Sequence, residues 1–207
     1  GDHRDLHKEY RRQRQMCIRD RFKGTAQYRK GEIDRITACQ GGSNNAFTSY
    51  DYTAYHFTFA SDRWEAALAI ESDRMINAQF DPKELELERR VIIEELKTDL
   101  DTPWGALHHK VEGESFTKHP YKFPIIGNYQ DLVSISRDQI VDYYRQFYSP
   151  NNAILVLVGD LKARQTLDQV EKLFSTLPSS VPPANNPEIS SRQANSKIVL
   201  QLSLIHI

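Results

Sequence analysis

The segment 81–100, DPKELELERRVIIEELKTDL, constrains the fold more than any other stretch, because its pattern fits a long amphipathic helix. Asp81 is a good N-cap, and Pro82 suits the first position of a helix. The apolar residues that recur at helical spacing are Leu85, Ile92 and Leu96. Because they form one stripe, we predict a helix over 81–100 whose striped side faces the core.

Two acidic residues of this helix lie at positions where burying a charged carboxylate costs free energy. Glu88 and Glu95 project about 40–60° from Ile92, along the edge of the buried face and two turns from each other. A carboxylate at a core edge needs a cation or hydrogen-bond donors nearby. Two interpretations stay open: edge residues that reach solvent or pair with an arginine such as Arg89 or Arg90, or a metal ligand and its helper.

Length and charge restrict the class of protein. The chain has 207 residues, enough for one large domain or two small ones. The charges of its 27 basic and 28 acidic residues nearly cancel, so no net positive charge favours nucleic acid or an anionic membrane as a partner. No apolar run approaches the roughly 18 residues that span a bilayer. Two cysteines are too few for a disulfide framework, and the compartment stays open.

The two ends of the chain differ in character from the rest. Residues 1–21 are charged and contain no apolar segment that could pack, and MCIRDR within them resembles translated sequencing-adapter sequence. The stretch LSLIHI at the other end also resembles translated adapter sequence. We therefore divide the chain into a non-native-looking stretch 1–21, an incomplete folded domain 22–201, and a non-native-looking tail 202–207.

The pattern between these ends predicts helices packed on a sheet. Alternation indicates a β-hairpin formed by 44–49 and 52–60, and the continuous apolar run 153–160 is typical of a strand covered on both faces. A further strand is expected at 197–201. Helices are expected within 22–42, over 64–77, up to Phe116, from Ser136, and over 163–174. This order predicts an α+β fold of two layers, with helices covering a mostly antiparallel or mixed sheet.

Several motifs occur in a fixed order along the chain. They include FKGT (22–25), GGSNNAFTSYDYTAYHF (41–57), ERRVIIEE (88–95) and YYRQFYSPNNAILVLVGD (143–160). Together they resemble the N-terminal, catalytic-type domain of the pitrilysin/insulinase metallopeptidases, which include the mitochondrial processing peptidase. The resemblance covers about 22–201 and implies a zinc-dependent endopeptidase.

The resemblance also implies roles for the two acids of the long helix. In this family two histidines of an H-x-x-E-H helix and a distant glutamate bind zinc. The distant ligand falls on Glu95, and a second required acid, seven residues earlier, falls on Glu88. The histidines fall on Gln15 and Arg19, and the catalytic glutamate on Ile18, and none of these fits. Because one carboxylate does not hold Zn²⁺ tightly, we predict that this chain is inactive.

A second group of metal-capable residues occurs in HHKVE. His108, His109 and Glu112 imitate the H-x-x-E-H motif imperfectly, with Gly113 where the second histidine belongs. We interpret them as a surface or helix-face pair with a neighbouring acid.

The hairpin is the expected place for substrate. In the family a peptide adds as an extra strand to the edge that matches Asn45, Ala46 and Phe47, through main-chain hydrogen bonds. The alternative is a plain hairpin in which Asn44 and Asn45 serve turn chemistry. The small side chain of Ala46 suits close approach of a substrate backbone.

The resemblance further implies a partner. Family enzymes combine such a domain with a second homologous domain or subunit that closes a chamber. The alternative function is that of a non-catalytic subunit, acting in assembly or substrate binding beside an active partner. The sequence before Phe22 would discriminate, because an H-x-x-E-H motif there favours the enzyme.

Overall fold

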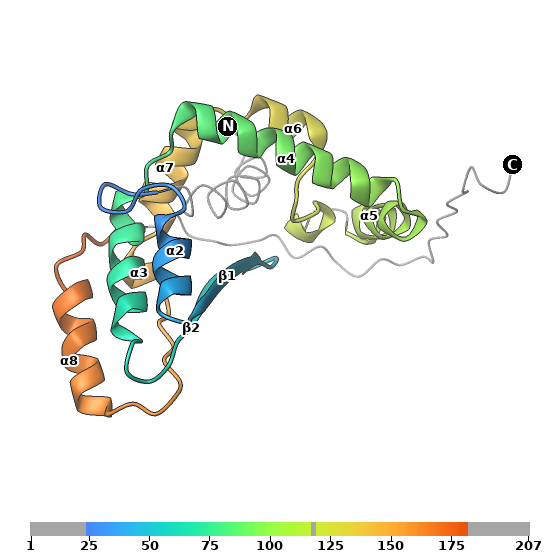
Figure 1. The fold of residues 1–207 in the computed structure, drawn as a ribbon. Coiled ribbons are helices and arrows are strands. Elements are labelled where there is room, and N and C mark those ends of the chain that lie inside the picture. Colours follow the sequence, from blue (N-terminus) through green and yellow to red (C-terminus); the bar gives the residue numbers. More distant parts are fainter. Residues whose placement is uncertain (1–23, 117–118, 182–207) are drawn as a thin grey trace, which may run out of the picture.

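The computed structural model of the chain describes residues 24–116 and 119–181 (Figure 1). These residues form a mostly helical fold with one small antiparallel sheet, which confirms the α+β class. The elements in chain order are α2 (Glu32–Cys39), β1 (Ser43–Thr48), β2 (Thr53–Thr58), α3 (Glu65–Asn77), α4 (Pro82–Leu100), α5 (Pro103–Ser115), η1 (Pro120–Lys122), α6 (Tyr129–Ser134), α7 (Arg137–Phe147), η2 (Pro150–Asn152) and α8 (Ala163–Phe174).

The predicted hairpin is present. β1 and β2 pair antiparallel, with Asn45 opposite His56 and Ala46 opposite Tyr55. The turn between them is closed by a hydrogen bond of 2.8 Å from the Ser49 amide to the Tyr52 carbonyl. The turn sequence therefore fixes the register, and with it the order of side chains along the outer edge of β1.

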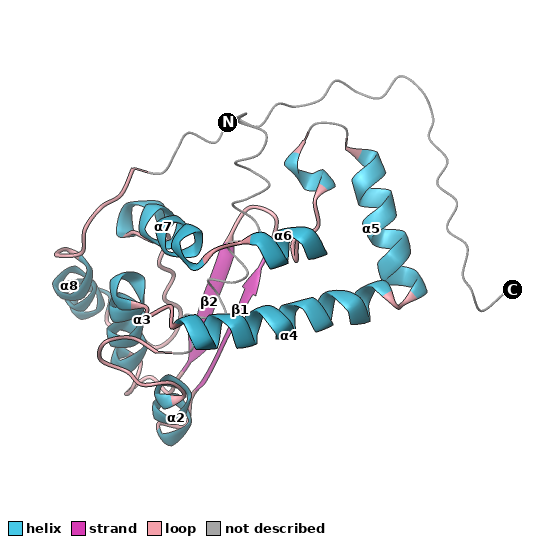
Figure 2. Cartoon of the chain, turned by 90° about the horizontal axis from the view of Figure 1, so that it is seen from above, coloured by secondary structure: helices cyan, strands magenta, loops and turns pink. Residues whose placement is uncertain are grey.

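The long helix begins and ends as predicted. The Asp81 carboxylate accepts hydrogen bonds from the amides of Lys83 and Glu84, at 2.9 and 3.1 Å, and Pro82 occupies the first turn. The residues of the predicted stripe, Leu85, Ile92 and Leu96, are all buried. α4 spans 19 residues and carries α5 at its far end, where the chain turns sharply (Figure 2).

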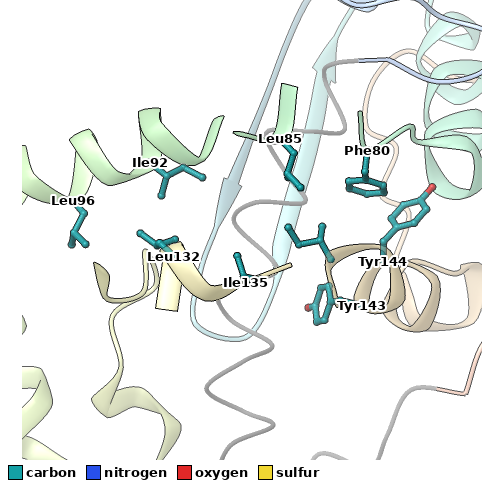
Figure 3. Close-up of a cluster of buried hydrophobic side chains, with 9 residues drawn as sticks. Phe80, Leu85, Ile92, Leu96, Leu132, Ile135, Tyr143 and Tyr144 are labelled. Atoms are coloured by element: carbon teal, nitrogen blue, oxygen red, sulfur yellow. The ribbon is translucent and has the colours of Figure 1, made fainter. Parts of the chain in front are cut away.

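The core lies between α4, α6 and α7 (Figure 3). Phe80, just before α4, packs edge-to-face on Tyr144 with ring centroids 5.1 Å apart. The Tyr144 hydroxyl donates to the Arg74 carbonyl at 2.8 Å and accepts from the Ala78 amide at 3.2 Å. The other buried members of the cluster are Leu85, Ile92, Leu96, Leu132, Ile135, Ile140 and Tyr143. This packing fixes α4 against the C-terminal half of the described chain.

Two elements depart from the sequence-based prediction. The run 153–160 was expected to be a strand covered on both faces, but it forms no strand, and Ile154 is 92% exposed. The prediction is wrong in this structure because a strand needs a paired neighbour, and the described residues place none beside this run. The short helix α6 was not predicted; the Asn128 side chain caps it by accepting from the Asp131 amide. The strand expected at 197–201 lies outside the described residues.

The remaining helices confirm their predicted ranges to within a few residues. They are α2, α3, α5, α7 and α8. At the start of α7, Ser136 and Gln139 form a reciprocal capping box. Among residues 24–116 and 119–181, no helix combines the length and apolar character needed to cross a membrane.

Candidate functional site

The two acids of α4 lie in different environments. Glu88 is buried, with 9% of its surface exposed, whereas Glu95 is exposed and lines a pocket. At 100° per residue both carboxylates lie beside the stripe of α4, but only Glu88 is buried, so the expected core-edge position applies to Glu88 and not to Glu95. Arg89 and Arg90, the neighbours considered as their partners, both form ion pairs with Glu86, at 3.0 and 3.6 Å.

The pocket beside Glu95 has a volume of about 600 Å³. Its walls come from α4, from α5, from the loop after η1, and from the turn of the hairpin. The lining residues are Tyr50, Glu95, Thr98, Asp99, Thr102, His108, His109, Glu112, Pro124, Ile125 and Ile126. Apart from Pro124, Ile125 and Ile126 the lining is polar, so the pocket is an open, mostly polar surface depression rather than an apolar ligand cavity.

The polar residues of this pocket are engaged with one another. His109 Nε2 lies 2.7 Å from Asp99 Oδ2, and His108 Nε2 lies 3.2 Å from Glu112 Oε1. The Tyr50 hydroxyl donates a hydrogen bond to Glu112 Oε1. This last contact joins the hairpin turn to α5, so the pocket wall holds the end of β1 near the helix pair.

Sequence reasoning placed the histidines on a helix face but missed their convergence with Glu95. Asp99 follows Glu95 by four residues, so their common side of α4 was a usable signal. The bond from Tyr50 to Glu112 spans 62 positions and had no local signal.

The described residues do not by themselves fit a zinc ion. Within 24–116 and 119–181, no three side chains of His, Cys, Asp or Glu are grouped so that they could hold a metal. Glu95 contributes one carboxylate, and positions 15, 18 and 19 lie outside the described residues. No catalytic step through zinc is therefore assigned to this chain.

The three residues expected to meet substrate lie on β1. Asn45 and Phe47 point to the exposed face, Phe47 with 49% of its surface accessible, and Ala46 is half-buried on the other face. The Asn45 side chain accepts from the Ala46 amide at 2.8 Å. Among the described residues, β1 pairs only with β2, so no strand covers its other edge there.

The chain is similar to known proteins in both sequence and fold. The family described as "Insulinase (Peptidase family M16)" matches residues 16–128, and "Peptidase M16 inactive domain" matches 134–202. The "Uncharacterized zinc protease YmxG" of Bacillus subtilis is 30% identical over 155 residues, which are 75% of this chain and 38% of that protein. The "Zinc protease PqqE" of Helicobacter pylori is 29% identical over 157 residues, 75% of this chain and 35% of that protein.

Solved structures agree with these matches. A protease from Helicobacter pylori is 27% identical with a TM-score of 0.80, over 84% of this chain and 42% of that one. The first half of the periplasmic protease PqqL from Escherichia coli shares the fold, with 23% identity and a TM-score of 0.74 over 84% of this chain and 39% of that one.

The chain thus spans little more than a third of the length of these curated relatives. The insulinase match alone covers more than half of the chain, and the second family match follows it in order. The residues of β1, of α4 and of the pocket wall all fall inside the first match. On these grounds the chain belongs to the insulinase (M16) family of peptidases.

Proposed function

We propose that the gene product to which this chain belongs is a zinc-dependent endopeptidase that cleaves extended peptides, and that the 207-residue chain itself is inactive. The observation that carries the proposal is the placement of Glu88 and Glu95. They lie two turns apart on one side of α4, and Glu95 lines a pocket whose wall includes the hairpin turn. The relatives' names as zinc proteases support the same class of reaction.

In this proposal Glu95 is the metal ligand that α4 supplies. Its carboxylate is exposed at the pocket, where an ion can reach it. Glu88 is the buried acid of the pair, and its burial restricts the rotamers available to it. The chain lacks matching residues at 15, 18 and 19, where the resemblance implies His, Glu and His, so it holds an incomplete ligand set.

Substrate is proposed to bind along β1. The edge of β1 that has no ladder partner among the described residues offers backbone donors and acceptors to an extended peptide. Asn45, Ala46 and Phe47 would flank that peptide, and a strand beside them would run toward the turn that contributes Tyr50 to the pocket. Backbone pairing of this kind accepts many sequences but requires an unfolded or short peptide.

The alternative is a non-catalytic family subunit that binds substrate or assembles beside an active partner. Missing zinc ligands would be natural in such a subunit, but retention of both Glu88 and Glu95 favours the enzyme. A second homologous domain or subunit that closes a chamber is part of either proposal. The codons upstream of Phe22 in the genomic sequence discriminate between the two, because only the enzyme requires H-x-x-E-H there.

The ligand role of Glu95 is tested by rebuilding the motif. The triple variant Q15H/I18E/R19H is titrated with Zn²⁺ against a chromophoric chelator, beside the unchanged chain, with circular dichroism as a check on folding. We expect the triple variant to bind zinc at least about 100-fold more tightly than the unchanged chain, because three protein ligands replace one.

The matched comparison uses two neighbouring glutamates. Adding Glu95→Gln to the triple variant should abolish the gained affinity. Adding Glu94→Gln should leave it intact, because Glu94 is exposed and pairs with Lys97 at 2.7 Å. Equal effects of the two substitutions, or tight zinc binding by the unchanged chain, would contradict the assignment.

A further inference from the structure

The proposed peptidase function does not use the segment 119–121, His-Pro-Tyr, which lies on the arm formed by α5 and η1. The Tyr121 hydroxyl donates a hydrogen bond of 2.6 Å to Asp51 Oδ2 in the turn of the hairpin, 70 positions earlier in the chain. The Tyr121 ring also packs on the Tyr50 ring, with centroids 4.7 Å apart. Tyr121 therefore joins the arm to the hairpin turn.

The chain holds Tyr121 in a defined orientation. Pro120 occupies the first turn of η1, and the His119 side chain caps it by accepting from the Tyr121 amide at 3.3 Å. The rings of His119 and Phe116 lie nearly perpendicular to the Tyr121 ring, with centroids 4.4 and 5.8 Å from its own. Because both its backbone and its ring are held, Tyr121 loses little further side-chain entropy when it bonds to Asp51.

The neighbouring turn residue makes a second bond to the same arm. The Tyr50 hydroxyl donates to Glu112 Oε1 on α5. Two consecutive turn residues thus contact two successive elements of the arm, and we call Tyr50, Asp51, Glu112 and Tyr121 the turn clamp. In Figure 1 the free end of the hairpin points toward α5, in agreement with these bonds.

The turn clamp sets the position of the proposed substrate edge. A two-stranded hairpin is only marginally stable by itself, and β1 pairs only with β2 among the described residues. Ala46 precedes Tyr50 by four residues, or about 13 Å of extended strand. Tyr50 lines the pocket that contains Glu95. The clamp therefore determines how far the edge of β1 lies from the Glu95 carboxylate.

We propose that Asp51 and Tyr121 are positioning residues for peptide hydrolysis: they hold the turn end of β1 so that a peptide paired with β1 presents its scissile bond beside Glu95. This inference rests on the proposed function, and the two residues act through β1 rather than by touching the peptide. Their bond is exposed at the surface, so it adds little to the stability of the fold. Positioning is more sensitive, because a displacement of about 1 Å at the reacting groups lowers a rate by about 100-fold.

Peptide hydrolysis by the full gene product tests the inference, with the internally quenched peptide that the unchanged protein cleaves fastest in a mixed-sequence library. Tyr121→Phe and Asp51→Ala each remove one partner of the bond. Both should lower kcat at least about 10-fold and change KM less than about 3-fold, because the peptide still pairs with β1. Asp51→Asn keeps an acceptor oxygen and should retain most of the activity.

A matched tyrosine provides the control. Tyr129 on α6 is 55% exposed and lies outside the turn clamp, so Tyr129→Phe should leave kcat unchanged. Each variant should melt within about 2 °C of the unchanged protein, because none of them alters the core.

Hydrogen exchange in the 207-residue chain gives a readout that does not require activity. Tyr121→Phe should speed exchange of the backbone amides in 47–53 at least about 10-fold, and Tyr129→Phe should not. Unchanged exchange, an unchanged kcat, or a larger fall in melting temperature in both Tyr121→Phe and Asp51→Ala would overturn the inference and leave the proposed function standing. A full gene product that cleaves no peptide in the library would instead overturn the proposed function, and the inference with it.

Discussion

Arg89 and Arg90 are adjacent on α4 but should differ greatly in their contribution to stability. The Arg89 side chain is 12% exposed, and its guanidinium donates to two backbone carbonyls at the end of α6, those of Leu132 and Ile135, the latter at 2.7 Å. Arg90 is 72% exposed and has an ion pair of 3.6 Å with Glu86. Replacing each arginine by methionine keeps most of the aliphatic stem and removes the charge.

The magnitude follows from these contacts. A hydrogen bond from a charged group contributes about 1.5–3 kcal/mol, and its loss leaves a carbonyl at the end of α6 without its donor. Two such bonds, reduced for partial exposure and for the retained packing of the stem, give about 2–4 kcal/mol for Arg89→Met. The exposed pair of Arg90 contributes less than about 0.5 kcal/mol, because surface ion pairs are weak.

Urea denaturation followed by circular dichroism measures the difference. With a slope of about 2 kcal/mol per molar urea, Arg89→Met should lower the midpoint by roughly 1–2 M, and Arg90→Met by less than about 0.3 M. Equal midpoints for the two variants would show that the guanidinium of Arg89 does not fasten α6 to α4, and the reasoning would fail.

Three further substitutions test other parts of the fold by the same assay. Tyr144→Phe should lower the free energy of unfolding by about 1–3 kcal/mol, because the hydroxyl donates to the Arg74 carbonyl and accepts from the Ala78 amide. An unchanged urea midpoint would refute this. Asp81→Ala should cost about 1 kcal/mol through loss of the α4 cap, so a neutral result would contradict the capping role. Burial, reinforced by two nearby carboxylates, raises the pKa of Tyr28 above 10.0. The folded state therefore holds this proton more tightly, and Tyr28 stabilises the fold below pH 10 but loses that contribution as pH rises through its raised pKa. Tyr28→Phe should lose less stability than the unchanged chain between pH 10 and 11; identical pH profiles would count against the assignment.

The parts of the fold that the sequence predicted are those set by local patterns. The N-cap Asp81 determines where α4 begins, and the stripe of Leu85, Ile92 and Leu96 determines which side of α4 is buried. The hairpin follows from the alternation of residues around a turn at Tyr50 and Asp51. The same local rules place Ser136 at the start of α7. These elements need no knowledge of distant residues.

The parts that escaped prediction depend on distant partners. The run 153–158 has strand composition, but a strand forms only where another strand pairs with it. The helix α6 is six residues long, too short to be stable alone, and Arg89 and the core hold it in place. The pocket at Glu95 could not be predicted for the same reason, because one of its walls comes from Tyr50, which is distant in sequence.

The three sides of α4 separate stability from function and make the zinc experiment interpretable. The stripe that contains Ile92 lies in the core, and Arg89 fastens α6 on one flank, so substitutions there act on folding. Glu88 is buried on the other flank. If its replacement abolished zinc binding, the cause could be unfolding as well as the loss of a functional carboxylate. Glu95 is exposed at the pocket, and its replacement removes a charge that solvent already reaches. A fold that stays intact while zinc affinity falls would therefore report on the ligand itself, and Glu95 is the member of the acid pair that can give this result.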